Sequence, residues 1–152
     1  MTRATSAAAR YYHRYMAPAG LPVLTIDGNQ FDDLDGFVRE FSTLLDNHDW
    51  HGNLDAFNDI LRGGFGTPEG GFVLRWLNSA RSRQMLGWEA TIEWYERTLV
   101  TCHPANREHL QAELDSARRR EGTTLFDWLI GIISDHGPGG TESENQVNLE
   151  LQ

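Results

Sequence analysis

The chain has 152 residues, a net charge of −9 and a single cysteine, Cys102. All 13 basic residues are arginines, which excludes enzymes that depend on a P-loop, Schiff-base or kinase-type lysine. No apolar run approaches the roughly 18 residues of a membrane-spanning helix, the N-terminus lacks a secretory signal, and one cysteine supports no internal disulfide. We therefore expect a single-domain cytoplasmic protein without a membrane partner.

The acidic charge lies outside the N-terminal segment. Residues 1–20 contain three arginines, no acidic residue and little periodicity, so we expect a mobile N-terminal extension. Residues 21–152 form the expected domain and carry all 22 acidic residues. Such a surface repels nucleic acid and attracts basic proteins, although simple solubility is an alternative explanation.

The first half of the domain is expected to alternate strands and helices. Residues 21–26 are apolar and precede an Asp-Gly-Asn turn, which predicts a strand. From Leu34 the apolar residues follow helical spacing. A second, shorter helix is predicted from Asn53, as N-cap, to Leu61, and it is stopped by Gly63 and Gly64.

The second half of the domain continues this alternation. Residues 72–76 are almost continuously apolar, which is typical of a strand buried on both faces of a parallel sheet. After a short helix, residues 88–121 show two helical patterns separated at Pro104, which predicts an inserted helical hairpin. A capping box at Thr124 opens another helix, and the alternation over 147–151 predicts a closing strand. This order predicts an α/β fold with a three-stranded parallel sheet packed with helices.

The short helix over 53–61 has the most informative pattern. At about 100° per residue, Asp55, Asn58 and Asp59 share one side of this helix, opposite its apolar residues. Two carboxylates one turn apart cost a helix about 0.2–0.5 kcal/mol, so stability alone does not explain them. A structural alternative is that Asp59 pairs with Arg62 on a solvated face. A small acid/base hydrolase is a third possibility, although the face has no neighbouring nucleophile.

One stretch of the chain resembles the signature of the barstar family of ribonuclease inhibitors: residues 50–61, WHGNLDAFNDIL, followed by Gly63. An aromatic residue and a glycine precede Asn-Leu-Asp-Ala, and a second aspartate follows four residues after the first. The resemblance covers residues 21–87 and 123–152. The hairpin at about 88–121 is extra to the minimal family pattern.

The resemblance implies a barstar-like, non-enzymatic immunity protein of a bacterial cytoplasm. Its acidic helix and flanking loops would block the active site of a basic extracellular or toxin ribonuclease, barnase-like, and so neutralise the toxin. An alternative on the same fold is an immunity or adaptor protein for a basic partner that is not a ribonuclease. The predicted partner-binding residues are Trp50, Asn53, Asp55, Asn58, Asp59, Gly63 and Gly64.

Other clusters in the sequence point to no further chemistry. His48 with His51, and Cys102 with His103 and His109, have spacings that match no metal site. The glycine-rich turn after the motif helix lacks the lysine of a phosphate-binding loop, so its expected use is close approach to a partner. We predict no catalytic residue, no metal and no cofactor.

Overall fold

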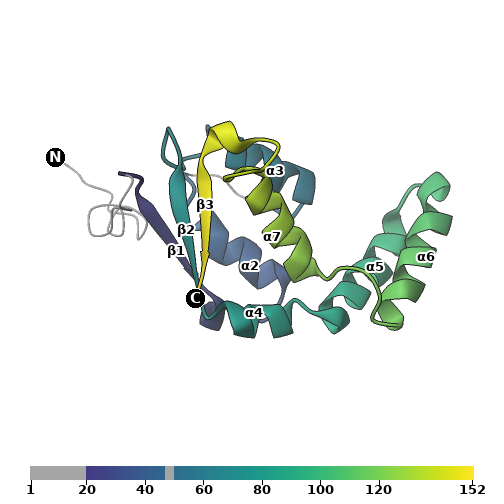
Figure 1. The fold of residues 1–152 in the computed structure, drawn as a ribbon. Coiled ribbons are helices and arrows are strands. Elements are labelled where there is room, and N and C mark those ends of the chain that lie inside the picture. The colour runs from purple at the N-terminus through teal and green to yellow at the C-terminus, as the bar shows by residue number, and fades with distance from the viewer. Residues whose placement is uncertain (1–19, 47–49) are drawn as a thin grey trace.

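The computed structural model describes residues 20–46 and 50–152, so the predicted extension over 1–20 lies outside the described residues except for its last position. Strands β1 (Val23–Asp27), β2 (Phe72–Leu77) and β3 (Val147–Leu151) form one sheet in the order β1-β2-β3 (Figure 1). Both pairings are parallel, with Val23 opposite Val73 and Phe72 opposite Val147. The predicted three-stranded parallel α/β fold is confirmed.

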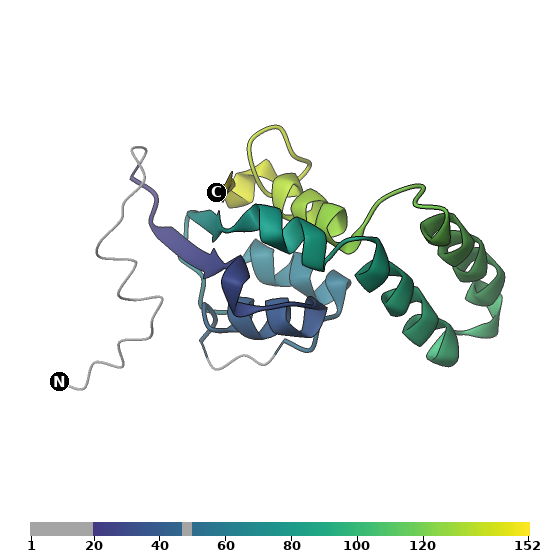
Figure 2. The same cartoon turned by 90° about the horizontal axis from the view of Figure 1, so that it is seen from below.

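The helices gather on one side of this sheet (Figures 1 and 2). Helices α2 (Leu34–Ser42), α3 (Leu54–Arg62) and α7 (Leu125–Asp135) pack there, and α4 (Ser79–Met85) follows the ends of the strands. Short 3-10 turns are η1 (Gly28–Gln30), η2 (Pro104–Asn106) and η3 (Ser143–Asn145). Within the described residues, no helix has the length and apolar character needed to cross a membrane.

Buried aromatic rings connect the sheet to the helices. Trp76 of β2 stacks on Phe37 of α2, with 5.2 Å between ring centroids. Phe37 in turn meets Phe57 of α3 edge to face at 5.8 Å. All three side chains are fully buried, and Trp76 Nε1 donates a hydrogen bond to Ser82 Oγ, which satisfies the polar end of its ring. The aromatic cluster therefore fixes the buried side of α3 against the rest of the domain.

The opposite face of the sheet is partly polar. The first three residues of β2, 72–74, are buried, as the prediction of burial on both faces requires. Arg75 is half-buried, and its Nε lies 2.9 Å from Glu150 Oε2 on β3. Parallel pairing places these two residues opposite each other, so a cross-strand ion pair replaces apolar packing there.

Residues 88–121 form the predicted helical hairpin. Helices α5 (Trp88–Thr101) and α6 (Arg107–Arg118) project from the side of the molecule away from the sheet (Figures 1 and 2). Their facing sides enclose a small separate cluster: Tyr95, Leu99, Leu114 and Ala117. The first turns of α5 belong to the domain instead, because the buried Thr91 Oγ1 accepts a hydrogen bond from Leu125 N–H at 2.9 Å.

Candidate functional site

Helix α3 begins at a capped N-terminus, as predicted. The side-chain oxygen of Asn53 accepts hydrogen bonds from the backbone N–H groups of Asp55, at 2.8 Å, and Ala56, at 3.1 Å. The backbone carbonyl of Asn53 accepts the indole N–H of Trp50 at 2.9 Å. Asn53 therefore caps the first turn of the helix, and the hydrogen bond from Trp50 fixes the position of Asn53.

Trp50 lies in the core rather than on the surface. Its side chain is 4% exposed, and its ring stacks on Phe57 with 4.7 Å between centroids. Packing and the bond to Asn53 occupy the indole in this structure, and the prediction that Trp50 takes part in partner binding stays a prediction. The structure gives Trp50 the role of positioning the loop that enters α3.

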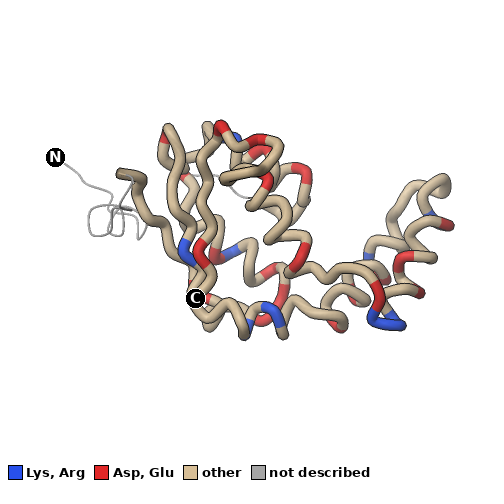
Figure 3. Tube along the Cα trace, in the orientation of Figure 1, with Lys and Arg blue, Asp and Glu red and all other residues tan. Residues whose placement is uncertain are grey.

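The polar side of α3 faces outward. Asp55 and Asp59 are exposed and Asn58 is half-buried, whereas Phe57 and Ile60 on the other side are buried. We call Asp55, Asn58 and Asp59 the acidic face. Acidic positions predominate around α3 and the turn that leads into β3 (Figure 3). The arrangement offers carboxylate oxygens to a cationic surface without any further folding step.

Helix α3 ends at two exposed glycines. Gly63 and Gly64 have φ angles of 110° and 91°, a region that strongly favours glycine. An added Cβ at either position would meet nothing within 4 Å, so backbone conformation rather than space requires glycine here. A hollow of about 250 Å³ adjoins this turn and extends to Glu144 and Asn145.

Arg62 joins the acidic face to the C-terminal part of the chain. Its Nη1 lies 2.5 Å from Asp59 Oδ1, so the pairing offered as the structural alternative is present in the structure. The other edge of the guanidinium, Nε and Nη2, contacts both oxygens of Glu142, at 2.8 and 2.5 Å. The hydrogen bond from Arg62 holds the pKa of the Glu142 carboxyl below its usual range, and the same contact raises the pKa of Arg62.

A fully buried histidine supports the same region. His136, at the end of α7, has Nε2 at 2.7 Å from Asn58 Oδ1 and Nδ1 at 2.7 Å from Asn145 Oδ1. Glu142 Oε2 lies 3.5 Å from Nδ1. Sequence analysis missed His136 and Glu142, because 78 and 80 positions separate them from their partners on α3 and no local pattern marks such contacts.

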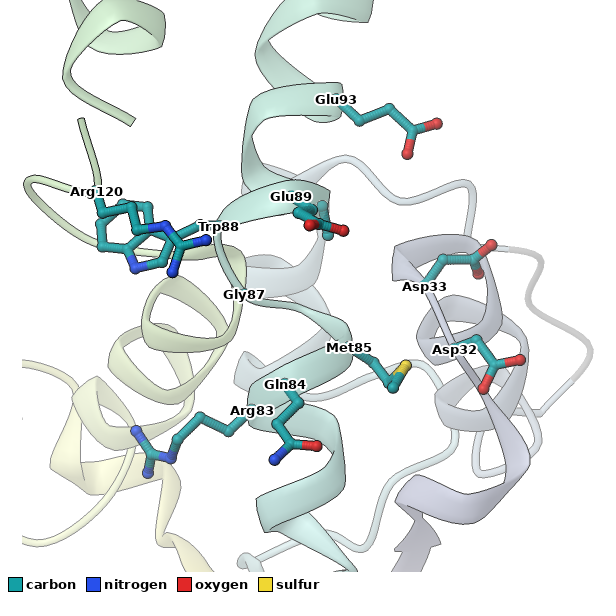
Figure 4. Close-up of a pocket in the computed structure, with 11 residues that line it drawn as sticks. Asp32, Asp33, Arg83, Gln84, Met85, Gly87, Trp88, Glu89, Glu93 and Arg120 are labelled. Carbon is teal, nitrogen blue, oxygen red and sulfur yellow. The ribbon is translucent and has the colours of Figure 1, made fainter. Parts of the chain in front are cut away.

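A second hollow, of about 610 Å³, lies where the hairpin joins the domain (Figure 4). The segment that runs from α4 into α5 separates two groups of charged side chains. On one side lie the carboxylates of Asp32, Asp33, Glu89 and Glu93, and on the other lie the guanidinium groups of Arg83 and Arg120. Three of these acids already have internal roles: Asp32 pairs with Arg81, Asp33 caps α2, and Glu93 lies 3.1 Å from Arg97. Three of the four acids that line this hollow are therefore already engaged within the domain or the hairpin.

The described residues contain no group of three His, Cys, Asp or Glu side chains that could hold a metal ion. His48, one half of a histidine pair considered above, lies outside the described residues. The carboxylates of Asp55 and Asp59 are exposed anions of this region.

Comparison with known proteins identifies a family for this chain. No curated protein and no solved structure matches the chain. The model of one family, described as "Barstar (barnase inhibitor)", matches residues 21–127. That range contains β1, β2, the whole of α3 with its capping residues, and the hairpin, and it ends in the first turn of α7. Because the match covers more than two thirds of the 152 residues, the chain belongs to the barstar family.

Proposed function

We propose that this protein binds a barnase-like ribonuclease and blocks its active site with the acidic face of α3 and the loops on either side. The observation that carries the proposal is the exposure of Asp55 and Asp59 on a helix whose other side is fixed in the core. Membership of a family described as barnase inhibitors supports a ribonuclease as the partner.

The chemistry of such an active site explains why carboxylates suit the task. A ribonuclease cleft holds cationic side chains that are arranged for a phosphate group. A carboxylate offers two oxygen acceptors to the same donors, and charge-assisted hydrogen bonds of this kind are about twice as strong as neutral ones. The net charge of −9 would also speed the encounter with a basic enzyme, more so at low ionic strength.

The residues of the site divide into contact and support. Asp59 and Asp55 offer exposed carboxylates, and the half-buried Asn58 lies beside them with its Oδ1 bonded to His136. Gly63 and Gly64 let the backbone come close to a partner because neither residue has a side chain. Trp50 and Asn53 hold the start of the helix. This division assigns binding energy to the aspartates and preorganisation to the buried support.

The remaining parts of the chain lie outside the proposed inhibitory surface. Residues 21–152 form the inhibitory domain, and the hairpin over about 88–121 is an elaboration outside the inhibitory surface. Residues 1–20 are a separate extension. The protein would act in the bacterial cytoplasm, where an immunity protein shields the producing cell before the enzyme is exported.

The test is inhibition of RNA cleavage by purified barnase, titrated with the purified protein. We expect cleavage to stop near a one-to-one ratio, and Asp59→Ala to abolish that effect. Asp115→Asn, on exposed α6, is the control, since it removes one negative charge away from the acidic face.

Two results would reject this function. Cleavage of RNA by the protein itself, lost in Asp59→Ala, would establish an enzyme instead. Capture from the native host of a basic protein without ribonuclease activity, bound through Asp59, would establish the immunity or adaptor alternative. A ribonuclease as the captured protein would support the proposal even if barnase itself is not inhibited.

A further inference from the structure

The acidic face contains its own competitor for a partner's cations. Arg62 lies one turn after Asp59 on α3, and its Nη1 contacts Asp59 Oδ1 at 2.5 Å. Both side chains are substantially exposed, 47% for Arg62 and 61% for Asp59. A guanidinium free to turn could bind both oxygens of Asp59 side by side, which is the strongest geometry for this pair. That arrangement would neutralise the carboxylate before a partner arrives.

Glu142 prevents this by binding the opposite edge of the guanidinium. Arg62 Nε donates to Glu142 Oε2 at 2.8 Å, and Nη2 donates to Oε1 at 2.5 Å, so the parallel two-bond geometry is formed with Glu142 rather than with Asp59. Asp59 receives the remaining Nη1 alone, through Oδ1. Among the described residues, Asp59 Oδ2 has no hydrogen-bond donor.

Glu142 is itself held in place by the end of α7. Its backbone N–H donates to the carbonyl of Asp135 at 2.8 Å, and its carboxylate lies 3.5 Å from the buried His136 ring. The Glu142 side chain is 25% exposed, about half the exposed fraction of Arg62. Glu142 is therefore less exposed to solvent than the arginine that it binds.

We propose that Glu142 is a positioning residue for inhibition: it holds Arg62 side-on, so that the Asp59 carboxylate stays open to the cations of the ribonuclease. The inference rests on the proposed function. It assigns to the turn before β3 a role that needs no contact between Glu142 and the partner. Loss of Glu142 would let Arg62 turn onto Asp59 and compete for the same oxygens.

A double-mutant cycle tests this coupling, with barnase, or the ribonuclease captured from the host, as the probe. Glu142→Gln is expected to raise Kd about tenfold. In the Arg62→Gln background the same change should alter Kd by no more than about twofold, because no competitor remains. Glu144→Gln, an exposed acid in the same turn, is the control for lost charge and should also stay within about twofold.

An equal loss of affinity from Glu142→Gln in both backgrounds would overturn the proposal, since Glu142 would then contact the partner directly. A partner-free measurement keeps this separate from the proposed function. The Nε–H proton of Arg62 should exchange with water faster in Glu142→Gln, and its exchange rate should be unchanged in Asp59→Ala, because Glu142 is its acceptor among the described residues. Faster exchange in Asp59→Ala alone would reject Glu142 as the anchor, whereas failure of the wild type to bind any ribonuclease rejects the function.

Discussion

Helix α3 and the α5–α6 hairpin are both amphipathic, yet they differ in how their acidic side chains are paired. On the hairpin, acids have arginine neighbours: Glu93 lies 3.1 Å from Arg97, and Glu96 lies 3.2 Å from Arg118. On α3, Asp55 has no ion pair within the described residues, and Asp59 shares Arg62 with Glu142. Several acids of the hairpin are thus paired with its own arginines, whereas Asp55 on the acidic face has no such pair among the described residues.

The two regions also differ in how they are attached. The buried side of α3 belongs to the main aromatic core through Phe57, and its first turn is held by Trp50. Beyond its first turns the hairpin has a small cluster of its own. A rigid attachment lowers the entropy lost when a surface binds, so the comparison favours α3 as the binding element and the hairpin as a peripheral one.

Removing the support of α3 gives the largest expected effect. Trp50→Ala should lower the free energy of unfolding by about 3–5 kcal/mol, since it opens a cavity beside Phe57 and removes the bond to Asn53. Trp50→Phe keeps most of the packing and should cost about 1 kcal/mol for the hydrogen bond. Urea unfolding of both variants measures this difference, and similar small losses in both would show that α3 does not depend on this ring.

Substitutions on the acidic face should weaken binding strongly and change stability little. Asp59→Ala is expected to cost at least about 2–5 kcal/mol of binding energy, the range typical of removing one partner of a desolvated charge pair. Stability should change by less than about 1 kcal/mol, because an exposed ion pair contributes little and the repulsion from Asp55 is relieved. Asp55→Ala should weaken binding less.

Thermal melting beside Kd for the bound ribonuclease checks both aspartate variants. A loss of several kcal/mol of stability in Asp59→Ala, with affinity nearly intact, would make Asp59 a structural partner of Arg62. The ion pair on the acidic face would then serve stability, as the ion pairs on the hairpin do.

The junction of the two regions should give a smaller effect. Thr91→Val leaves the buried Leu125 N–H without its acceptor, which should cost about 1–3 kcal/mol of stability. Thr98→Val in the same helix removes a bond within α5, from Oγ1 to the Trp94 carbonyl, and should stay within about 0.5 kcal/mol. Chemical denaturation of both variants measures the free energy of unfolding. Equal losses would mean that the first turns of α5 are held by the domain no more firmly than the end of α5.

Local signals in the sequence were sufficient for the elements of the fold. The N-cap at Asn53, the glycine stop at Gly63 and the capping box at Thr124 are all confirmed, because each depends on residues within one turn of the helix end. The parallel sheet follows from strands separated by helices. These features could be predicted without knowing which residues far apart in the sequence are in contact.

Long-range packing could not be predicted in the same way. Trp50 sits beside the motif, but its burial depends on Phe37 and Phe41 of α2. The contacts of Asn58 with His136 and of Arg62 with Glu142 depend on how α7 ends beside α3. Periodicity identifies which face of a helix is polar, but it does not say which polar groups a second segment will engage.

Shortening the hairpin should have the smallest effect on binding, and it tests the comparison directly. The structure suggests replacing residues 97–117 by a short Gly/Ser link, because Arg118 Nη2 contacts Glu96 Oε1 at 3.2 Å across the two helices, which places both ends of the excised segment in the same region. Thr91 is retained in this variant, and so is its bond to Leu125. Affinity for the ribonuclease should stay within about twofold, an energy of about 0.4 kcal/mol, while stability falls through loss of the cluster around Leu114. Leu114→Asp disrupts that cluster without excision and serves as the second variant. A folded product of either kind that no longer inhibits would place the hairpin in the interface, and α3 would not be the whole binding element.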